Sequence, residues 1–385
     1  MRPLLASSAL GFAGLSLLMP VAPLWALDGG ADELGAGLVN TVLMLFTVIA
    51  QLSMGTVLAR LGWSRTLAVG SGLLGLPALG HLLTDHVGAI ASLAAVRGLG
   101  FGILTVCGAT AVAALVEPAR RGRAVGAYGL AVAVPQCLLV PIAPWLAERV
   151  GFWLVFVCAA VPSLAIPLAP RVARALHGRD GAPGAPADRK DDARRGLFRV
   201  LIGPIAALLA ITTAGGAILT FTPRLLADPA AVSLALLAFT ATAALSRWRF
   251  GAVADRGGAG PAIGPLLLFG AGGLAVIGAG AARGSAATGA ALVVAGMLTA
   301  GVAYGGLQNL TLVQAFAAAG EEARSSVSVA WNVGFDAGTG LGALAAGAVA
   351  TASSYPVAYA ALAVGTALVG ACWSAARRGA RGVPR

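Results

Sequence analysis

Charged residues are scarce in this chain. Only 11% of its 385 residues are Asp, Glu, Lys or Arg, while 58% are hydrophobic and the mean hydropathy is +0.87. Soluble domains are about 25% charged and about 45–50% apolar. So few charged side chains cannot cover the surface of a soluble protein of this length. The composition therefore excludes a soluble enzyme.

Cysteine and histidine are also rare. Four cysteines occur, all within apolar segments and without CxxC spacing: Cys107, Cys137, Cys158 and Cys372. This pattern predicts neither a disulfide framework nor a metal site. His81 and His86 flank a short stretch that we predict to be a solvated outer loop. The sequence has no phosphate-binding loop and no Ser-His-Asp or zinc pattern, so we expect no cofactor and no enzymatic activity.

Long apolar segments are what the sequence has in abundance. A membrane-spanning helix needs about 20 mostly apolar residues. Twelve segments meet this need, at roughly 3–26, 36–57, 67–84, 88–115, 125–146, 152–172, 198–222, 229–246, 262–281, 286–317, 326–349 and 356–376. Because further apolar segments follow the first one, a secreted protein with a signal peptide is excluded. We predict an all-α membrane protein with twelve transmembrane helices.

Membrane topology explains the net charge of +11. The basic residues are 25 arginines and Lys190. With the N-terminus inside, 22 of them fall on the inside, three fall in outside loops, and Arg97 lies within a helix. Both termini are therefore predicted to be cytoplasmic, and no nucleic-acid partner is expected. The excess of Arg, Ala and Gly is typical of a GC-rich bacterial genome, so we expect a multi-pass protein of the bacterial cytoplasmic membrane.

One polar stretch divides the chain. Residues 173–197 are rich in Pro, Gly and charges of both signs, which predicts a flexible cytoplasmic linker. The expected domains are an N-terminal six-helix half at 1–172, the linker at 173–197, and a C-terminal six-helix half at 198–385.

An internal repeat supports this division. The pattern Gln51-xxx-Gly55-xxx-Ala59-Arg60-x-Gly62 recurs, at an offset of 196, as Arg247-xxx-Gly251-xxx-Asp255-Arg256-x-Gly258. A second match, at an offset of 203, pairs Ala127-Tyr128 with Ala330-Trp331. Two halves related by a pseudo-two-fold axis along the membrane normal are typical of transporters.

At these motifs the chain resembles the major facilitator superfamily. The loop GTVLARLGWSR at 55–65 is similar to the family signature between helices 2 and 3, through Gly55, Arg60, Gly62 and Arg65. Its second copy, GAVADRGG at 251–258, matches better. The run from Arg97 to Gly102 is similar to the family's helix 4 arginine motif. The run 324–342 is similar to helix 11 of bacterial drug and small-metabolite exporters.

The resemblance implies a twelve-helix major facilitator fold, with two halves that rock about a central cavity. Two departures accompany it. Ala59 replaces an acidic residue that helps to latch one conformation in the family, which implies a weaker or differently built latch, whereas Asp255 keeps that position in the second copy. In the segment 125–146, Pro135 alone remains of the family's proton-antiporter signature.

Two charged residues fall deep within predicted helices. Asp336 is the one acidic residue placed inside an apolar segment, and Arg97 lies at a similar depth. A charge there costs several kcal/mol unless it is paired or reaches water. We therefore predict that Asp336 carries the coupling proton, the alternative being an aspartate locked by hydrogen bonds. Arg97 binds an anionic substrate group, pairs transiently with an acid, or holds its helix to the first two helices.

Neutral polar residues follow helical spacing in several segments. The residues that we predict to line the substrate cavity together with Arg97 are Asn40, Gln51, Tyr304, Gln308, Trp331 and Asn332. The alternative for such stripes is helix packing through interhelical hydrogen bonds.

These observations favour a secondary transporter that works by alternating access. The predicted activity is proton-coupled efflux of a drug or metabolite by a monomer in the lipid bilayer, with a small-molecule substrate and protons as partners. Two alternatives remain: proton-coupled uptake of a sugar or organic anion, and a membrane sensor that does not transport.

Overall fold

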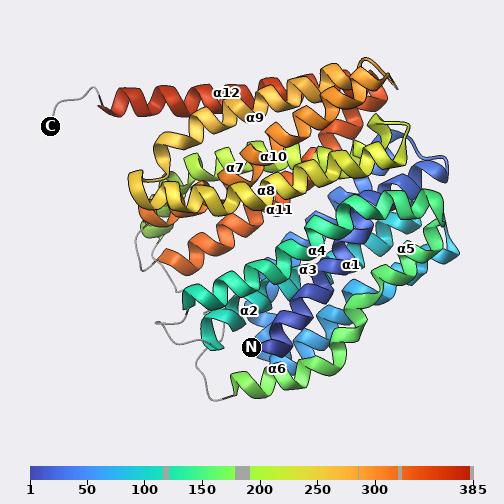
Figure 1. Cartoon of the computed structure of the whole chain (residues 1–385). Helices are drawn as coiled ribbons and strands as arrows, with labels where there is room; N and C mark the ends of the chain where they lie inside the picture. Colours follow the sequence, from blue (N-terminus) through green and yellow to red (C-terminus); the bar gives the residue numbers. More distant parts are fainter. Residues whose placement is uncertain (116–120, 178–190, 285, 320–322, 382–385) are drawn as a thin grey trace. The chain divides into compact units, whose positions relative to one another are not determined.

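Helices make up nearly all of the structure, which is a computed structural model that describes residues 1–115, 121–177, 191–284, 286–319 and 323–381 (Figure 1). Over these residues no strand occurs. The elements are α1 (Arg2–Asp28), α2 (Glu33–Gly75), η1 (Leu76–Leu83), α3 (Val87–Leu115), α4 (Arg121–Arg149), α5 (Phe152–Ala159), η3 (Val161–Leu168), α6 (Ala169–Leu176), α7 (Asp191–Leu225), α8 (Pro229–Gly257), α9 (Gly260–Ala281), α10 (Ala287–Ala319), α11 (Arg324–Ala352) and α12 (Tyr355–Arg381).

Eleven helical stretches in the described ranges are long and apolar enough to cross a membrane. The chain is thus a multi-pass membrane protein. The difference from twelve predicted segments lies in one stretch, Glu33–Leu83, which is 51 residues long. At 1.5 Å per residue it would extend about 77 Å, more than twice the thickness of the hydrocarbon core. It therefore holds two of the predicted segments, 36–57 and 67–84, and its backbone breaks at Gly62, where φ is 68°.

The chain forms two compact units, Met1–Ala185 and Pro186–Arg385, which we call the N-unit and the C-unit. Helix α6 ends at Leu176 and α7 begins at Asp191, so helix enters both ends of the predicted linker 173–197. Residues 178–190, the middle of that linker, lie outside the described residues. Each unit is considered by itself below.

In the N-unit, α3 packs closely against α2 through glycines. A Cβ atom on Gly98 would overlap the carbonyl of Leu43, and one on Gly102 would overlap the carbonyl of Thr47. Small residues allow helix backbones in membranes to approach in this way. The glycines of the arginine run are therefore packing residues.

In the C-unit, α10 packs against α8 in the same manner (Figure 1). A Cβ atom on Gly301 would overlap the carbonyl of Phe239, and one on Gly305 would overlap the carbonyl of Ala243. At the offset of 203, these two glycines correspond to Gly98 and Gly102 of the N-unit. At the offset of 196, the two residues that provide the carbonyls correspond to Leu43 and Thr47. The repeat in the sequence is thus also a repeat of contacts.

Helix caps follow the same repeat. The Asp32 carboxylate accepts a hydrogen bond from the backbone N–H of Gly35 (2.8 Å) and caps α2. Its repeat counterpart Asp228 accepts from Ala230 N–H (3.1 Å) and caps α8. A carboxylate at this position satisfies an N–H group that has no partner within the helix.

Candidate functional site

The acidic residue predicted for proton coupling is buried within the C-unit. Asp336 lies on α11 and is 5% exposed. The phenol of Tyr304 on α10 lies close enough to Asp336 and to Arg247 to interact with both charges. Tyr304 on α10 thus has one charged neighbour on α8, Arg247, and another on α11, Asp336.

Hydrogen bonds fix Arg247 to α10. The Arg247 Nη1 atom donates to Gln308 Oε1 at 3.1 Å. The Asn309 side-chain amide donates to the carbonyl oxygen of Arg247 at 3.2 Å. Two successive residues of α10 therefore hold both the side chain and the backbone of Arg247.

Aromatic rings complete the arrangement. Trp331 stacks on Phe335 on α11, with ring centroids 5.6 Å apart, and its indole N–H donates to Thr311 Oγ1 on α10 at 3.1 Å. Tyr304 lies between Phe335 (6.2 Å) and Phe239 of α8 (5.0 Å). Such ring pairs stabilise the packing by more than the burial of their apolar area alone.

We call Arg247, Tyr304, Gln308, Trp331 and Asp336 the C-unit cluster. Four of these residues were predicted as site residues from the sequence, and the structure brings them together. The sequence assigned Arg247 instead to the conformational loop motif, and its place in the cluster was missed. The signal that could have revealed it is its repeat position, because Arg247 is the charged counterpart of the neutral Gln51.

Asn332, also predicted for the cavity, is partly buried and bonds within its own helix. Its amide donates to the carbonyl oxygen of Ser328 at 2.8 Å. This bond occupies one donor of the amide and leaves the side chain on α11, one turn before Asp336.

The polar residues predicted for the cavity in the N-unit join helices to one another. The Asn40 amide donates to the carbonyl oxygen of Met19 on α1 at 2.8 Å. The Gln51 amide donates to Thr105 Oγ1 on α3 at 3.5 Å. These bonds match the helix-packing alternative that the sequence left open.

Arg97 likewise bonds to backbone carbonyls. It lies on α3, is 1% exposed, and donates from Nε to Leu74 O (3.3 Å) and from Nη2 to Gly14 O (3.1 Å). The guanidinium therefore ties α3 to α2 and α1. Of the three roles considered from the sequence, this geometry favours holding the helices together.

The prediction of a solvated position for His81 was wrong. His81 was expected in a solvated loop, but it is fully buried in η1, where its ring packs 5.1 Å from that of Phe156 and its Nδ1 lies 3.2 Å from Ala78 O. The apolar 3₁₀ segment carries the ring inward, while His86 is exposed as expected. Within the described chain, no group of three or more His, Cys, Asp or Glu side chains could hold a metal.

We expect Arg97→Lys to destabilise the protein by about 1–3 kcal/mol, because an ammonium group cannot reach both carbonyls and one buried acceptor is left unpaired. Thermal unfolding of the purified protein in detergent measures this loss. Arg60→Lys, at an exposed position, is the control. Unchanged stability together with weakened binding of an anionic substrate would instead place Arg97 in substrate recognition.

The two copies of the loop motif share an unusual backbone conformation. Gly62 and Gly258 are equivalent in the repeat and have positive φ values of 68° and 74°. Glycine adopts this region without steric cost. Both glycines therefore allow the chain to turn between two helices.

Other loop-motif positions differ in their surroundings. Arg60 and Arg65 are exposed. A Cβ atom on Gly55 would meet no atom within 4 Å, whereas one on Gly251 would lie 3.3 Å from the Asn309 amide. The side chains of Asp255 and Arg256, on which the predicted latch depends, lie outside the described residues.

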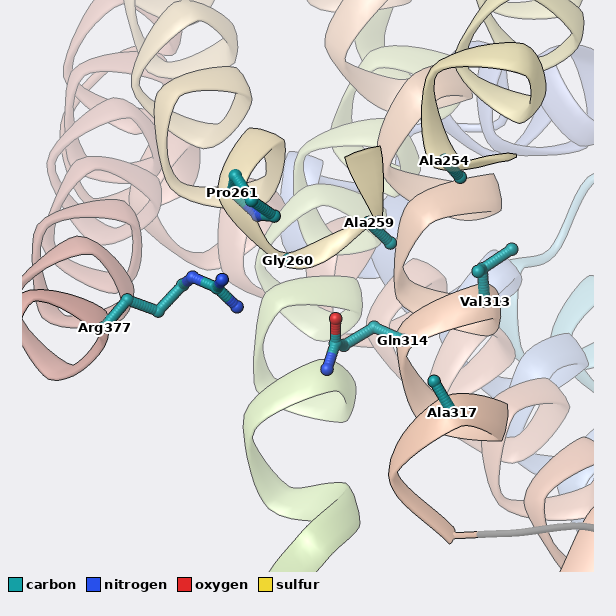
Figure 2. A pocket seen from close by; sticks show the side chains of 9 residues that line it. Ala254, Ala259, Gly260, Pro261, Val313, Gln314, Ala317 and Arg377 are labelled. Atoms are coloured by element: carbon teal, nitrogen blue, oxygen red, sulfur yellow. The ribbon is translucent and has the colours of Figure 1, made fainter. Parts of the chain in front are cut away.

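A cavity of about 490 Å³ opens next to the second copy of the motif. It is lined by the end of α8, the start of α9, and residues of α10 and α12, and the side chains of Gln314 and Arg377 extend into it (Figure 2). None of the residues predicted to bind substrate lines it. This cavity is therefore a feature separate from the C-unit cluster.

Comparisons with known proteins agree with this architecture. The model of the family described as Major Facilitator Superfamily matches residues 4–338. The solved structure of the nucleoside transporter NupG has a TM-score of 0.69 at 14% identity, covering 97% of this chain and 99% of that chain. A bacterial homolog of the human lysosomal transporter Spinster, inward-facing and unoccupied, has a TM-score of 0.74 at 14% identity, covering 98% and 96%. No curated protein sequence matches the chain. At these identities the solved structures show a shared fold.

Proposed function

The chain belongs to the Major Facilitator Superfamily and is a transporter, and on this basis we propose that it exports a small organic compound from the bacterial cytoplasm in exchange for protons. The observation that carries the proposal is Asp336, a carboxyl group buried inside the C-unit and within electrostatic range of Tyr304. Ionisable groups inside membrane helices are costly and mark ion and proton pathways. We place both termini in the cytoplasm and take the working unit to be a monomer.

The chemistry of the proposal is a carboxyl group whose surroundings change. A carboxylate that reaches water on one side of the membrane binds a proton there, and it releases the proton when its exposure moves to the other side. Alternating access opens the transport site to one side at a time, so substrate and proton cross in opposite directions. A proton gradient then supplies the energy for export.

The second candidate function is proton-coupled uptake. One similar structure is that of a nucleoside transporter, and the segment around Pro135 lacks most of the antiporter signature. Uptake uses the same carboxyl group, with substrate and proton crossing in the same direction. Direction must therefore be measured.

We expect deletion of the gene to make a compound accumulate inside the cells and disappear from the medium. Metabolite profiling of cells and medium, with the gene intact or deleted, identifies this compound and thereby the substrate. Restoring the gene on a plasmid must reverse the change. A compound that deletion leaves unused in the medium would show uptake and overturn the proposed direction.

A further inference from the structure

The two units contain an equivalent interhelical hydrogen bond. In the N-unit Gln51 bonds to Thr105, and in the C-unit Arg247 bonds to Gln308. Gln51 and Arg247 are paired by the first offset of the repeat, and Thr105 and Gln308 by the second. Both units therefore have a polar bond at this place, and in the N-unit a neutral amide makes it.

The other charged or ionisable members of the C-unit cluster have apolar counterparts. At an offset of 203, Tyr304 corresponds to Phe101 and Asp336 to Ala133. Phe101 packs edge-to-face on Phe12, with centroids 5.3 Å apart, and has no hydroxyl. The N-unit thus folds with a glutamine, a phenylalanine and an alanine where the C-unit has an arginine, a tyrosine and an aspartate.

The three changes occur together, and Tyr304 lies between the other two along the contacts of the C-unit. Gln308, one turn from Tyr304 on α10, holds Arg247 at 3.1 Å, and the Tyr304 ring lies 6.2 Å from that of Phe335, the residue before Asp336. Tyr304 lies within the electrostatic range of both Arg247 and Asp336. A permanent cation close to a carboxyl group favours its charged form, and the phenol between them can transmit the effect through its own hydroxyl. The N-unit packs without these three side chains, so the shared architecture does not require them.

We propose that Arg247, held by Gln308, is the positioning cation that sets proton binding at Asp336 through Tyr304. The inference rests on the proposed function, which makes Asp336 the proton site. It replaces Arg97 as the switching partner, because the guanidinium of Arg97 is engaged with the carbonyls of Leu74 and Gly14.

Two other helices, α7 and α12, also pack on α11, and their described contacts near Asp336 involve neutral groups. From α7, Thr212 lies against Gly338, and Ile205 and Leu208 lie against Gly334. The nearest described charge on α7 is the exposed Arg199, about two turns from Ile205. From α12, Tyr359 donates to Ala217 O (3.4 Å) and Tyr355 packs on Phe221, so both are near the other end of α7. Tyr304 therefore remains the group on a neighbouring helix through which Arg247 can act on Asp336.

The test titrates Asp336 directly and needs no substrate. Infrared difference spectra of the full chain in lipid vesicles are recorded as a function of pH. A protonated carboxyl group gives a carbonyl stretching band, and the band that is missing in Asp336→Asn is assigned to Asp336. Arg247→Gln, the residue of the N-unit repeat, keeps a bond to Gln308 and removes the charge. Arg247→Lys keeps the charge. Arg249→Gln lies on the same helix and outside the cluster, is exposed as Arg247 is, and controls for net charge.

We expect Arg247→Gln to raise the midpoint pH of this band by about one unit, because the cation no longer opposes protonation. Arg247→Lys and Arg249→Gln should stay close to the wild-type midpoint. A midpoint unchanged by Arg247→Gln, in a protein with wild-type helical content, would overturn this inference and leave the proposed function intact. If the wild type has no titrating band that Asp336→Asn removes, proton coupling at Asp336 fails, and the inference fails with it.

Discussion

Asp336→Asn is expected to abolish proton-driven transport and to leave the fold intact. Asparagine has nearly the same size and keeps hydrogen-bonding groups, but it cannot release and rebind a proton in this range. The N-unit carries Ala133 at the equivalent position, so the helical architecture does not depend on a carboxyl group there. With the compound identified by metabolite profiling, accumulation in vesicles under an imposed pH gradient should fall to background.

The matched control for this variant is Asp228→Asn. Asp228 is exposed and caps α8, and asparagine caps helices about as well as aspartate, so this change removes an acidic group at no cost to transport. Facilitated exchange of the compound without a pH gradient should persist in the Asp336 variant, which separates lost coupling from lost binding. Normal pH-driven accumulation by Asp336→Asn would contradict the proton role.

Gly305→Ala should destabilise the C-unit, although it adds a single methyl group. The new Cβ atom would overlap the backbone carbonyl of Ala243 and lie against the Ser246 hydroxyl, and a backbone atom cannot move aside as a flexible side chain can. Overpacking of this kind costs about 1–3 kcal/mol. Because α8 and α10 carry Arg247, Gln308 and Tyr304, a forced separation of these helices also disturbs the C-unit cluster. Thermal unfolding in detergent measures the loss of stability, and vesicle transport measures the loss of activity.

Substitution of a second glycine is the control, and its expected effect on stability has the opposite sign. In α9, a Cβ atom on Gly272 would meet no atom within 4 Å. Gly272→Ala should therefore leave stability unchanged or raise it by a few tenths of a kcal/mol up to about 1 kcal/mol, since alanine favours helix over glycine. Gly102→Ala, at the repeat position in the N-unit, should behave like Gly305→Ala in stability. Equal melting temperatures for Gly305→Ala and Gly272→Ala would show that the close approach of α8 and α10 does not contribute to stability.

The helices and the repeat were predictable because both depend on local or periodic properties of the chain. Hydropathy over about 20 residues identifies a span wherever it packs. The two offsets of the repeat predicted which positions are equivalent, and the Asp32 and Asp228 caps, the paired positive-φ glycines and the glycine–carbonyl contacts all follow them. The family was recognisable for the same reason, since each of its motifs is a contiguous stretch of sequence.

The roles of individual polar residues were less predictable. Helices of this protein are apolar nearly all round, so periodicity does not indicate which face meets another helix and which meets lipid. His81 shows the consequence, because a histidine beside a loop was expected in water and instead lies within the N-unit. Arg97 shows it as well, since its depth was clear from the sequence but its partners Leu74 and Gly14, 23 and 83 residues away, were not.

The order of amino acids alone establishes a membrane-embedded helical transporter of two repeated halves, with one acidic residue deep in its helices. It does not establish which cation acts on that acid, and our proposal of Arg247 depends on the contacts of the folded chain. Arg97 and Arg247 are both arginines in or beside apolar helices. From the sequence, Arg97 was considered as a transient partner of an acid, whereas the contacts of the folded chain lead us to propose Arg247. The choice depends on which helix faces meet, so that Arg247 lies against Gln308, 61 residues away, and within electrostatic range of Tyr304. Contacts across helices are set by packing, and packing is a property of the folded chain.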